Sequence, residues 1–275
     1  MVEMKRHTTN IFYLVRGMWK SRELIVQMTK REVVGRYRGS ALGLLWSFFN
    51  PILMLTIYTF VFSVVFKARW GSGGENKFEF ALILFAGLIV FNLFVECVNR
   101  APTLIIGNVN YVKKVVFPLE ILPLIAMGAA LFHAVVSLGV LLLFYMLVSA
   151  SLQWTVIFAP VVMLPLMLVT LGLSWFLASF GVFVRDVAQT ISLLTAVLMF
   201  VSPVFFPVSS IPEKYRIFIY MNPLTFIIEQ MRDVLIWGKL PSWYGWGVSL
   251  VIGAVVAWLG LVWFQKTRKG FADVL

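Results

Sequence analysis

Two ionisable side chains that could carry a proton, Glu96 and His133, stand within the apolar stretches of this 275-residue chain. An ion-coupled carrier places such groups near the middle of a membrane. Glu96 lies near one end of its apolar stretch, where a carboxylate can reach water. His133 lies in the middle of the next stretch, where a neutral histidine bonded to a neighbouring helix fits better than a proton relay. These residues alone give little support for ion-driven chemistry.

The sequence lacks the residue patterns of the common catalytic sites and of the common nucleotide-binding sites. Neither the phosphate-binding pattern G-x-x-x-x-G-K-[ST] nor the metal-binding pattern H-E-x-x-H occurs in the sequence. No pairing of a nucleophile with a base is evident. The single cysteine, Cys97, excludes an intramolecular disulfide and a cysteine-based metal cluster. We therefore expect no catalytic residue, no metal site and no cofactor in this chain, and no enzyme activity of its own.

The composition is that of a membrane protein. Hydrophobic residues make up 61% of the chain and charged residues only 13%, whereas soluble domains carry about 25% charged residues. The net charge of +11 would suggest nucleic acid as a partner of a soluble protein. Here the basic residues lie between apolar stretches and not in one patch, so we expect membrane lipids as the surroundings and no nucleic-acid partner.

Six apolar segments approach or exceed the roughly 20 residues with which a helix crosses a bilayer. The sequence therefore predicts an all-α integral membrane protein with six transmembrane helices. The predicted spans are 42–66, 80–98, 121–148, 155–183, 187–206 and 243–264. They divide the chain into an N-terminal segment of 1–41, a membrane domain of 42–265 and a tail of 266–275.

Lysine and arginine are distributed unequally between the two sides of these spans. Sixteen of the 23 basic residues fall in the segments on the side of the N-terminus, and seven fall on the opposite side. Cytoplasmic loops of membrane proteins carry an excess of positive charge. We therefore expect both termini to be cytoplasmic.

Residues 21–38, just before the first span, have a helical pattern with two apolar faces. A helix that lies on a membrane normally has one wet face, so this helix either bends near 29–30 or is held by lipid on one side and protein on the other. Arg36 and Arg38 then mark the cytoplasmic border, where they meet anionic headgroups or a partner, or simply end the segment at the interface. The two faces consist of Leu24, Ile25 and Met28, and of Val33, Val34 and Tyr37.

Residues 203–241 are too apolar for a solvated loop and too interrupted by proline to span the membrane. Asn222 and Pro223 predict a helix start, and Gly238 suits the helix end. A helix of about 15 residues is about 22 Å long, which is shorter than the hydrocarbon layer. We expect two short re-entrant helices at about 207–240 on the outer side, or an interfacial loop anchored by aromatic residues. Glu229, Arg232 and Asp233 share one helix face.

Several segments, by their order and spacing, resemble the permease subunits of type-2 ABC exporters. The resemblance is closest to the Wzm-like subunits that export O-antigen and related lipid-linked polysaccharides, and it covers nearly the whole chain. The matching segments are TKREVVGRYRGSALGLLWSFFNPILMLTIYTFVFS (29–63), VKKVVFPLEILPL (112–124), FVRDV (183–187), NPLTFIIEQMRDVLIWGKLP (222–241) and FADVL (271–275).

The resemblance implies a dimer of permeases in the bacterial inner membrane, joined to two ATP-binding cassette subunits that bind the ATP and magnesium. It makes the segment before the first span an amphipathic interface helix and assigns the ATPase contact to the loop 99–120. Lys113 and Lys114 also fit the positive charge bias of inner loops without any further role. The residues implied at the ATPase contact are Arg31, Glu32, Tyr111, Lys113, Lys114 and Phe117. Those implied at the outer gate are Asn222, Pro223, Glu229, Arg232 and Asp233.

The implied substrate is a polysaccharide on a polyprenyl diphosphate lipid, and the resemblance places the first and fifth spans along the channel. Flat aromatic faces let sugar rings slide without tight bonding, although aromatic residues in membrane helices more often pack or contact lipid. The diphosphate favours cations at the entrance, for which Arg36 and Arg38 are candidates. Export of teichoic acid, capsule or a small amphiphile remains an alternative, as does an ion-coupled carrier or channel. The candidate channel aromatics are Trp46, Phe49, Tyr58 and Phe200.

Overall fold

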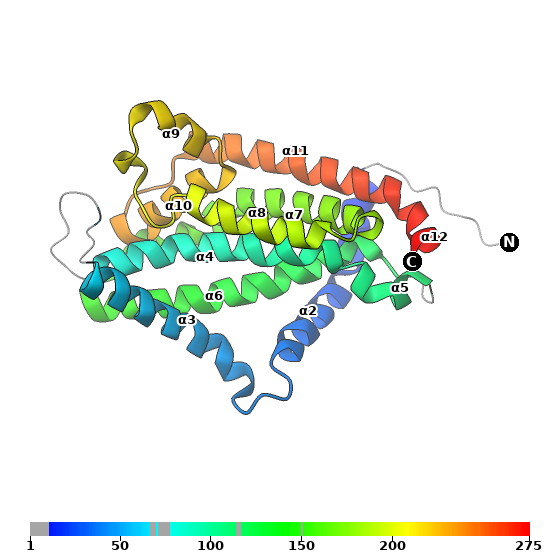
Figure 1. The fold of residues 1–275 in the computed structure, drawn as a ribbon, viewed down its shortest axis with the longest axis horizontal. Coiled ribbons are helices and arrows are strands. Elements are labelled where there is room, and N and C mark those ends of the chain that lie inside the picture. The colour runs from blue at the N-terminus through cyan, green and yellow to red at the C-terminus, as the bar shows by residue number, and fades with distance from the viewer. Residues whose placement is uncertain (1–10, 67–69, 71–77, 114–116, 150) are drawn as a thin grey trace.

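The computed structural model describes residues 11–66, 70, 78–113, 117–149 and 151–275. All regular secondary structure in these residues is helical, as the sequence predicts. Most of the long helices run along one axis of the molecule, with α9 and α10 near one end and α5 and α12 near the other (Figure 1). The α-helices are α1 (Ile11–Lys20), α2 (Arg22–Arg36), α3 (Trp46–Tyr58), α4 (Glu79–Arg100), α5 (Val109–Lys113), α6 (Leu122–Ser149), α7 (Ala159–Phe183), α8 (Val187–Val201), α9 (Glu213–Tyr220), α10 (Pro223–Arg232), α11 (Trp243–Thr267) and α12 (Phe271–Val274).

Helix α4 forms the centre of the bundle. It is apolar on all sides, and its residues from Phe80 to Phe91 are all buried. It packs against α6, α7, α8 and α10, which surround it (Figure 1). A helix that is apolar all round is stable only when other protein or lipid covers it. The other long helices therefore take their positions from α4.

Within the described residues, five helical stretches are long and apolar enough to cross a membrane. They correspond to the predicted spans one to four and six. The predicted fifth span, 187–206, contains α8, which has only 15 residues and ends at Val201. Ser202 breaks the helix with an extended backbone (ψ 147°) because it precedes Pro203, and proline disfavours helical geometry in the residue before it. The five stretches are Gly43–Phe62, Glu79–Thr103, Leu119–Ser149, Trp154–Phe183 and Trp243–Val274.

Helix α2 is continuous from Arg22 to Arg36. Leu24, Ile25 and Met28 pack against a small apolar core at the α5 end of the molecule. On the other predicted face, Val33 is buried while Val34 is half exposed. Protein therefore contacts α2 on both predicted apolar faces. From its end the chain turns sharply into α3, so that the two helices form a V outside the bundle (Figure 1).

Helices α7 and α11 pack along much of their length and meet through glycine. A Cβ atom on Gly260 would overlap the backbone of Gly172, and one on Gly172 would overlap the backbone of Val256. Small residues let membrane helices approach until their backbones touch, and this close contact replaces the missing hydrophobic drive between helices in lipid. These glycines therefore fix the spacing between α7 and α11.

Replacing Gly260 with Ala should lower the free energy of unfolding by about 2 kcal/mol, because the added methyl group pushes α11 away from α7. Thermal unfolding of the purified protein in detergent would measure this. The matched control is Gly247→Ala in the same helix, where a Cβ atom meets no other atom within 4 Å. Equal unfolding temperatures for the two variants would contradict the close contact.

Candidate functional site

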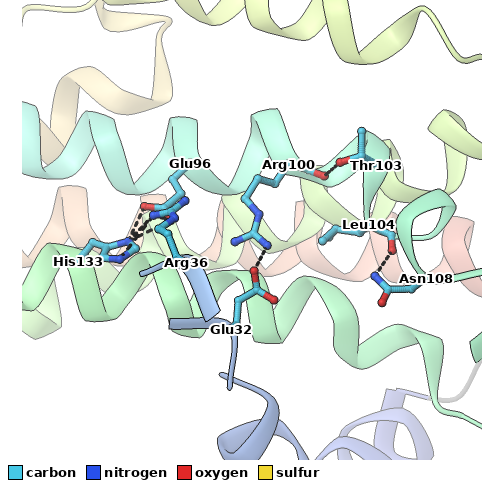
Figure 2. Close-up of polar contacts among 8 residues, drawn as sticks. All are labelled: Glu32, Arg36, Glu96, Arg100, Thr103, Leu104, Asn108 and His133. Carbon is cyan, nitrogen blue, oxygen red and sulfur yellow. Dashed lines mark hydrogen bonds and ion pairs between the residues drawn. The ribbon is translucent and has the colours of Figure 1, made fainter. Parts of the chain in front are cut away.

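The C-terminal end of α2 meets α4 and α6 through a cluster of polar side chains, which we call the docking cluster: Arg36, Tyr37, Glu96 and His133 (Figure 2 shows all but Tyr37). Arg36 Nη1 lies 2.8 Å from Glu96 Oε1 and 3.0 Å from His133 Nδ1. His133 Nδ1 lies 3.0 Å from both carboxylate oxygens of Glu96. The Tyr37 hydroxyl lies 3.2 Å from His133 Nε2.

One histidine tautomer satisfies most of these contacts. With the proton on Nδ1, the neutral ring donates to Glu96 and accepts from the Tyr37 hydroxyl at Nε2. Burial raises the pKa of Tyr37, so its hydroxyl remains a donor at neutral pH. Arg36 then pairs directly with Glu96. His133 therefore bonds to a neighbouring helix, as the sequence suggests.

A second ion pair lies one helical turn away from the docking cluster. Glu32, four residues before Arg36 on α2, contacts Arg100, four residues after Glu96 on α4 (Figure 2). On both helices the acid comes four residues before the base, so the two pairs form together only because α2 and α4 run in opposite directions here. Thr29 closes the contact with α6, because a Cβ atom on Gly128 would lie only 2.7 Å from its hydroxyl. Helix α2 is thus fixed in register, and not merely laid on the surface.

The docking cluster also forms the polar end of a cavity of about 430 Å³ between α2, α3, α4 and α6. Asn50 of α3 and Asn92 of α4 add amide groups to this wall. The remaining lining is mostly apolar and includes Met54, Phe85 and Leu88. Sequence reasoning named Arg36, Tyr37, Tyr58, Glu96 and His133 from this lining but not the amides, because the spacing of the amides shows no pattern that marks a common site.

The residues implied at the ATPase contact occupy two places near the α5 end. Tyr111 of α5 stacks on the buried Phe117, with ring centroids 4.4 Å apart. Lys113 and, on α2, Arg31 are exposed. Glu32 contributes to the pair with Arg100. Lys114 lies outside the described residues.

The residues implied at the outer gate lie at the opposite end, on and around α10. The predicted helix start is confirmed: Asn222 Oδ1 accepts from the Leu224 N–H at 3.0 Å, and Pro223 is the first helical residue. The predicted stop is also confirmed, since Gly238 has a left-handed backbone (φ 65°). Asp233 lies 3.8 Å from Lys239. Glu229 is partly buried, and burial raises its pKa.

Arg232 is the most deeply buried basic residue of this end, with only 3% exposed. Its Nε donates to the Ile83 carbonyl at 3.0 Å, and its Nη2 donates to the Val204 carbonyl at 2.8 Å. Its guanidinium lies 4.4 Å from the ring centroid of Trp70. Burial lowers the pKa of Arg232 to about 9, so it remains cationic at neutral pH. The sequence predicted a shared face with Glu229 and Asp233 but gave no sign of these backbone partners.

The aromatic residues proposed for the channel lie on α3 and α8. Trp46 and Phe49 of α3 are about half exposed and contact each other, with centroids 6.4 Å apart. Phe200 of α8 is 72% exposed. Tyr58 instead lines the cavity beside the docking cluster. Beyond the ends of α3 and α8, Phe62 stacks on Phe205, with centroids 5.9 Å apart.

Comparison with known proteins gives consistent matches over most of the chain. Residues 23–236 match the family model described as ABC-2 type transporter. The chain is 29% identical, over 94% of its length and 98% of the relative's, to the O-antigen export system permease protein RfbA of Myxococcus xanthus. It is 29% identical to a protein of the same name from Klebsiella pneumoniae, over 92% and 95% of the two lengths. It is 25% identical to the polysialic acid transport protein KpsM of Escherichia coli, over 87% and 91%.

Replacing Glu96 with Gln should lower the free energy of unfolding by about 1–3 kcal/mol, because Arg36 and His133 lose the anion that pairs with them in a poorly hydrated site. Tryptophan fluorescence during thermal unfolding in detergent would measure the change. Glu213→Gln is the control, since that side chain is 91% exposed and its loss should change stability by less than about 0.5 kcal/mol. A Glu96→Gln protein as stable as the control would mean that the cluster does not hold α2.

Proposed function

Because this chain belongs to the ABC-2 transporter family, we propose that it is the permease subunit of an ATP-driven exporter that moves a lipid-linked polysaccharide of the O-antigen type across the bacterial inner membrane. The observation that carries this proposal is the match with the O-antigen export permeases from end to end, over 94% of this chain and 98% of the relative. The similarity therefore extends over nearly the full length of both chains and is not confined to one part.

The proposed topology has six crossings with both termini in the cytoplasm. Five crossings are the long helices, and the remaining one consists of α8, about 22 Å long by its 15 residues, together with the irregular residues 202–206. Irregular backbone is tolerated at membrane depth only where protein satisfies it. Ser202 and Val204 are fully buried. Asn222 Nδ2 donates to the Ser202 hydroxyl at 2.8 Å, and Arg232 donates to the Val204 carbonyl. These bonds support the crossing, with α9 and α10 as re-entrant gate helices.

The driving force would come from outside this chain. We assign ATP and magnesium to two ATP-binding cassette subunits that meet a permease dimer on its cytoplasmic side. The contacts would be α2, through Arg31, and the loop 99–120, through Tyr111, Lys113 and Lys114. A push on α2 would reach α4 and α6 through the pair Glu32–Arg100 and through the docking cluster. The division of the chain into 1–41, 42–265 and 266–275 follows this scheme.

The substrate diphosphate would enter at the cytoplasmic border near Arg36 and Arg38. Arg38 is the freer cation of the two, because it is exposed whereas Arg36 is paired with Glu96. The glycan would then pass along aromatic faces of α3 and α8, with Trp46, Phe49 and Phe200 as the exposed candidates. Asn222, Pro223, Glu229, Arg232 and Asp233 would belong to the gate at the outer end.

A capsule-type glycan is the second candidate cargo, because a polysialic acid transport protein is also similar to most of the chain. The two candidate cargoes predict different phenotypes when the exporter is deleted. Deleting an O-antigen exporter removes the long glycan from lipopolysaccharide, whereas deleting a capsule exporter removes the capsule and leaves lipopolysaccharide unchanged.

Inactivating the ATPase partner in cells that carry this chain should abolish surface polysaccharide while lipid-linked glycan accumulates inside, because the permease has no phosphate-binding loop of its own. Immunoblotting of intact cells and of extracted lipids would measure both pools. Expression of an active ATPase is the control. Normal export without ATPase activity would reject an ATP-driven permease and favour an ion-coupled carrier.

Replacing Arg36 and Arg38 together with Ala should reduce export at least several-fold while the protein stays in the membrane, because the cationic entrance is lost. Surface glycan per unit of membrane-embedded permease would measure it. The double change Arg16→Ala and Lys20→Ala, at two exposed residues of α1, removes the same charge and serves as the control. Equal export by both variants would contradict the proposal that Arg36 and Arg38 form the substrate entrance.

A further inference from the structure

The C-terminal tail returns to the cytoplasmic end of the bundle and is anchored there by an aromatic residue. Phe271 of α12 has no exposed surface. Its ring centroid lies 5.5 Å from that of Phe264 in α11 and 6.1 Å from that of Phe183 at the end of α7. The last residue, Leu275, packs against the same apolar core. The tail is therefore part of the folded structure, and it lies beside α5 (Figure 1).

Arg268 connects this tail to the loop before α6. Its Nη1 lies 2.8 Å from the Glu120 carboxylate, and its Nη2 donates to the Phe117 carbonyl at 3.0 Å. The side chains of Arg268 and Glu120 are only 23% and 17% exposed. A charged pair that also bonds a backbone carbonyl is stronger and more directional than a surface ion pair.

The contact continues from Phe117 to α5. The stacking of Phe117 on Tyr111 joins the residue that Arg268 holds to the helix that contains Lys113. On the other side, Trp175 of α7 donates to the Glu120 carbonyl at 2.9 Å. Both ends of the segment around Phe117 are thus fixed, one by the tail and one by α7.

We propose that Arg268 and the tail 268–275 are positioning elements of the ATPase coupling contact, which hold α5 and Phe117 against the force of ATP binding and release. This inference rests on the proposed function, which assigns the ATPase contact to the loop 99–120. Without the tail, a push on α5 would displace the loop alone. With the tail, the push is shared by α7 and α11, to which Phe271 is packed.

The test uses the complex of permease and ATPase reconstituted in lipid, with three permease variants. Arg268→Glu places two acids together, Glu120→Arg combined with Arg268→Glu restores the pair with its charges exchanged, and Lys269→Glu changes the neighbouring exposed charge by the same amount. Hydrogen exchange of residues 104–113 reports the order of the loop. The amount of glycan exported per ATP hydrolysed reports coupling, and the amount of ATPase that co-purifies reports assembly.

We expect Arg268→Glu to raise hydrogen exchange in the loop at least fivefold and to lower glycan export per ATP at least fivefold. The exchanged pair restores the ion pair but not the bond to the Phe117 carbonyl, so it should recover both in part, and Lys269→Glu should match the unaltered protein. Unchanged loop exchange in Arg268→Glu, or no recovery in the exchanged pair, would overturn the positioning role. Faster loop exchange with unaltered coupling and assembly would instead show that this loop does not transmit the ATPase signal, which overturns both the inference and the coupling part of the proposed function.

Discussion

The free-energy cost of placing charged groups and unpaired backbone groups in a bilayer governs this structure. An unpaired polar group in hydrocarbon costs several kcal/mol, so each charge carried into the bundle must meet a partner from another part of the chain. Where α2 joins the bundle, Glu96 of α4 meets Arg36 of α2 and His133 of α6. These contacts make α2 a fixed part of the bundle. Any force on α2 must therefore act on the membrane helices as well.

The same constraint shapes the opposite end. The backbone after α8 leaves the helix at Ser202, so its polar groups need partners from other parts of the protein. Arg232 donates to the Val204 carbonyl, and Asn222 donates to the Ser202 hydroxyl. Arg232 also donates to the Ile83 carbonyl of α4 and lies over the ring of Trp70. The short helix α10 is therefore joined to α4 and to the segment after α8 by polar bonds that a rearrangement of this end must break.

Close packing connects these two polar ends. Helix α4 is buried almost throughout, and α7 and α11 touch through glycine backbones. Because hydrophobic drive between helices is lost in lipid, this contact of matched surfaces replaces it. A rigid centre with polar contacts at both ends suits the proposed permease, in which movement at the proposed ATPase contact must reach the proposed gate at the other end.

The sequence by itself determined the elements and their ends. Apolar length located the membrane helices, Asn222 and Pro223 gave the start of α10, and Gly238 gave the end of the helical segment that continues from α10 through residues 233–237, because these signals depend on neighbouring residues only. The predicted fifth span, 187–206, was longer than α8, which ends at Val201. The effect of Pro203 on the backbone of Ser202 outweighed the apolar residues that follow.

Only the tertiary structure decided which charges meet. Glu32 and Arg100 are 68 residues apart, and Arg268 and Glu120 are 148 apart. Periodicity tells which face of a helix a residue occupies, but not which helix will lie against that face. That choice depends on how all the helices pack at once, and this is why Trp70 and the carbonyl partners of Arg232 left no signal in the sequence.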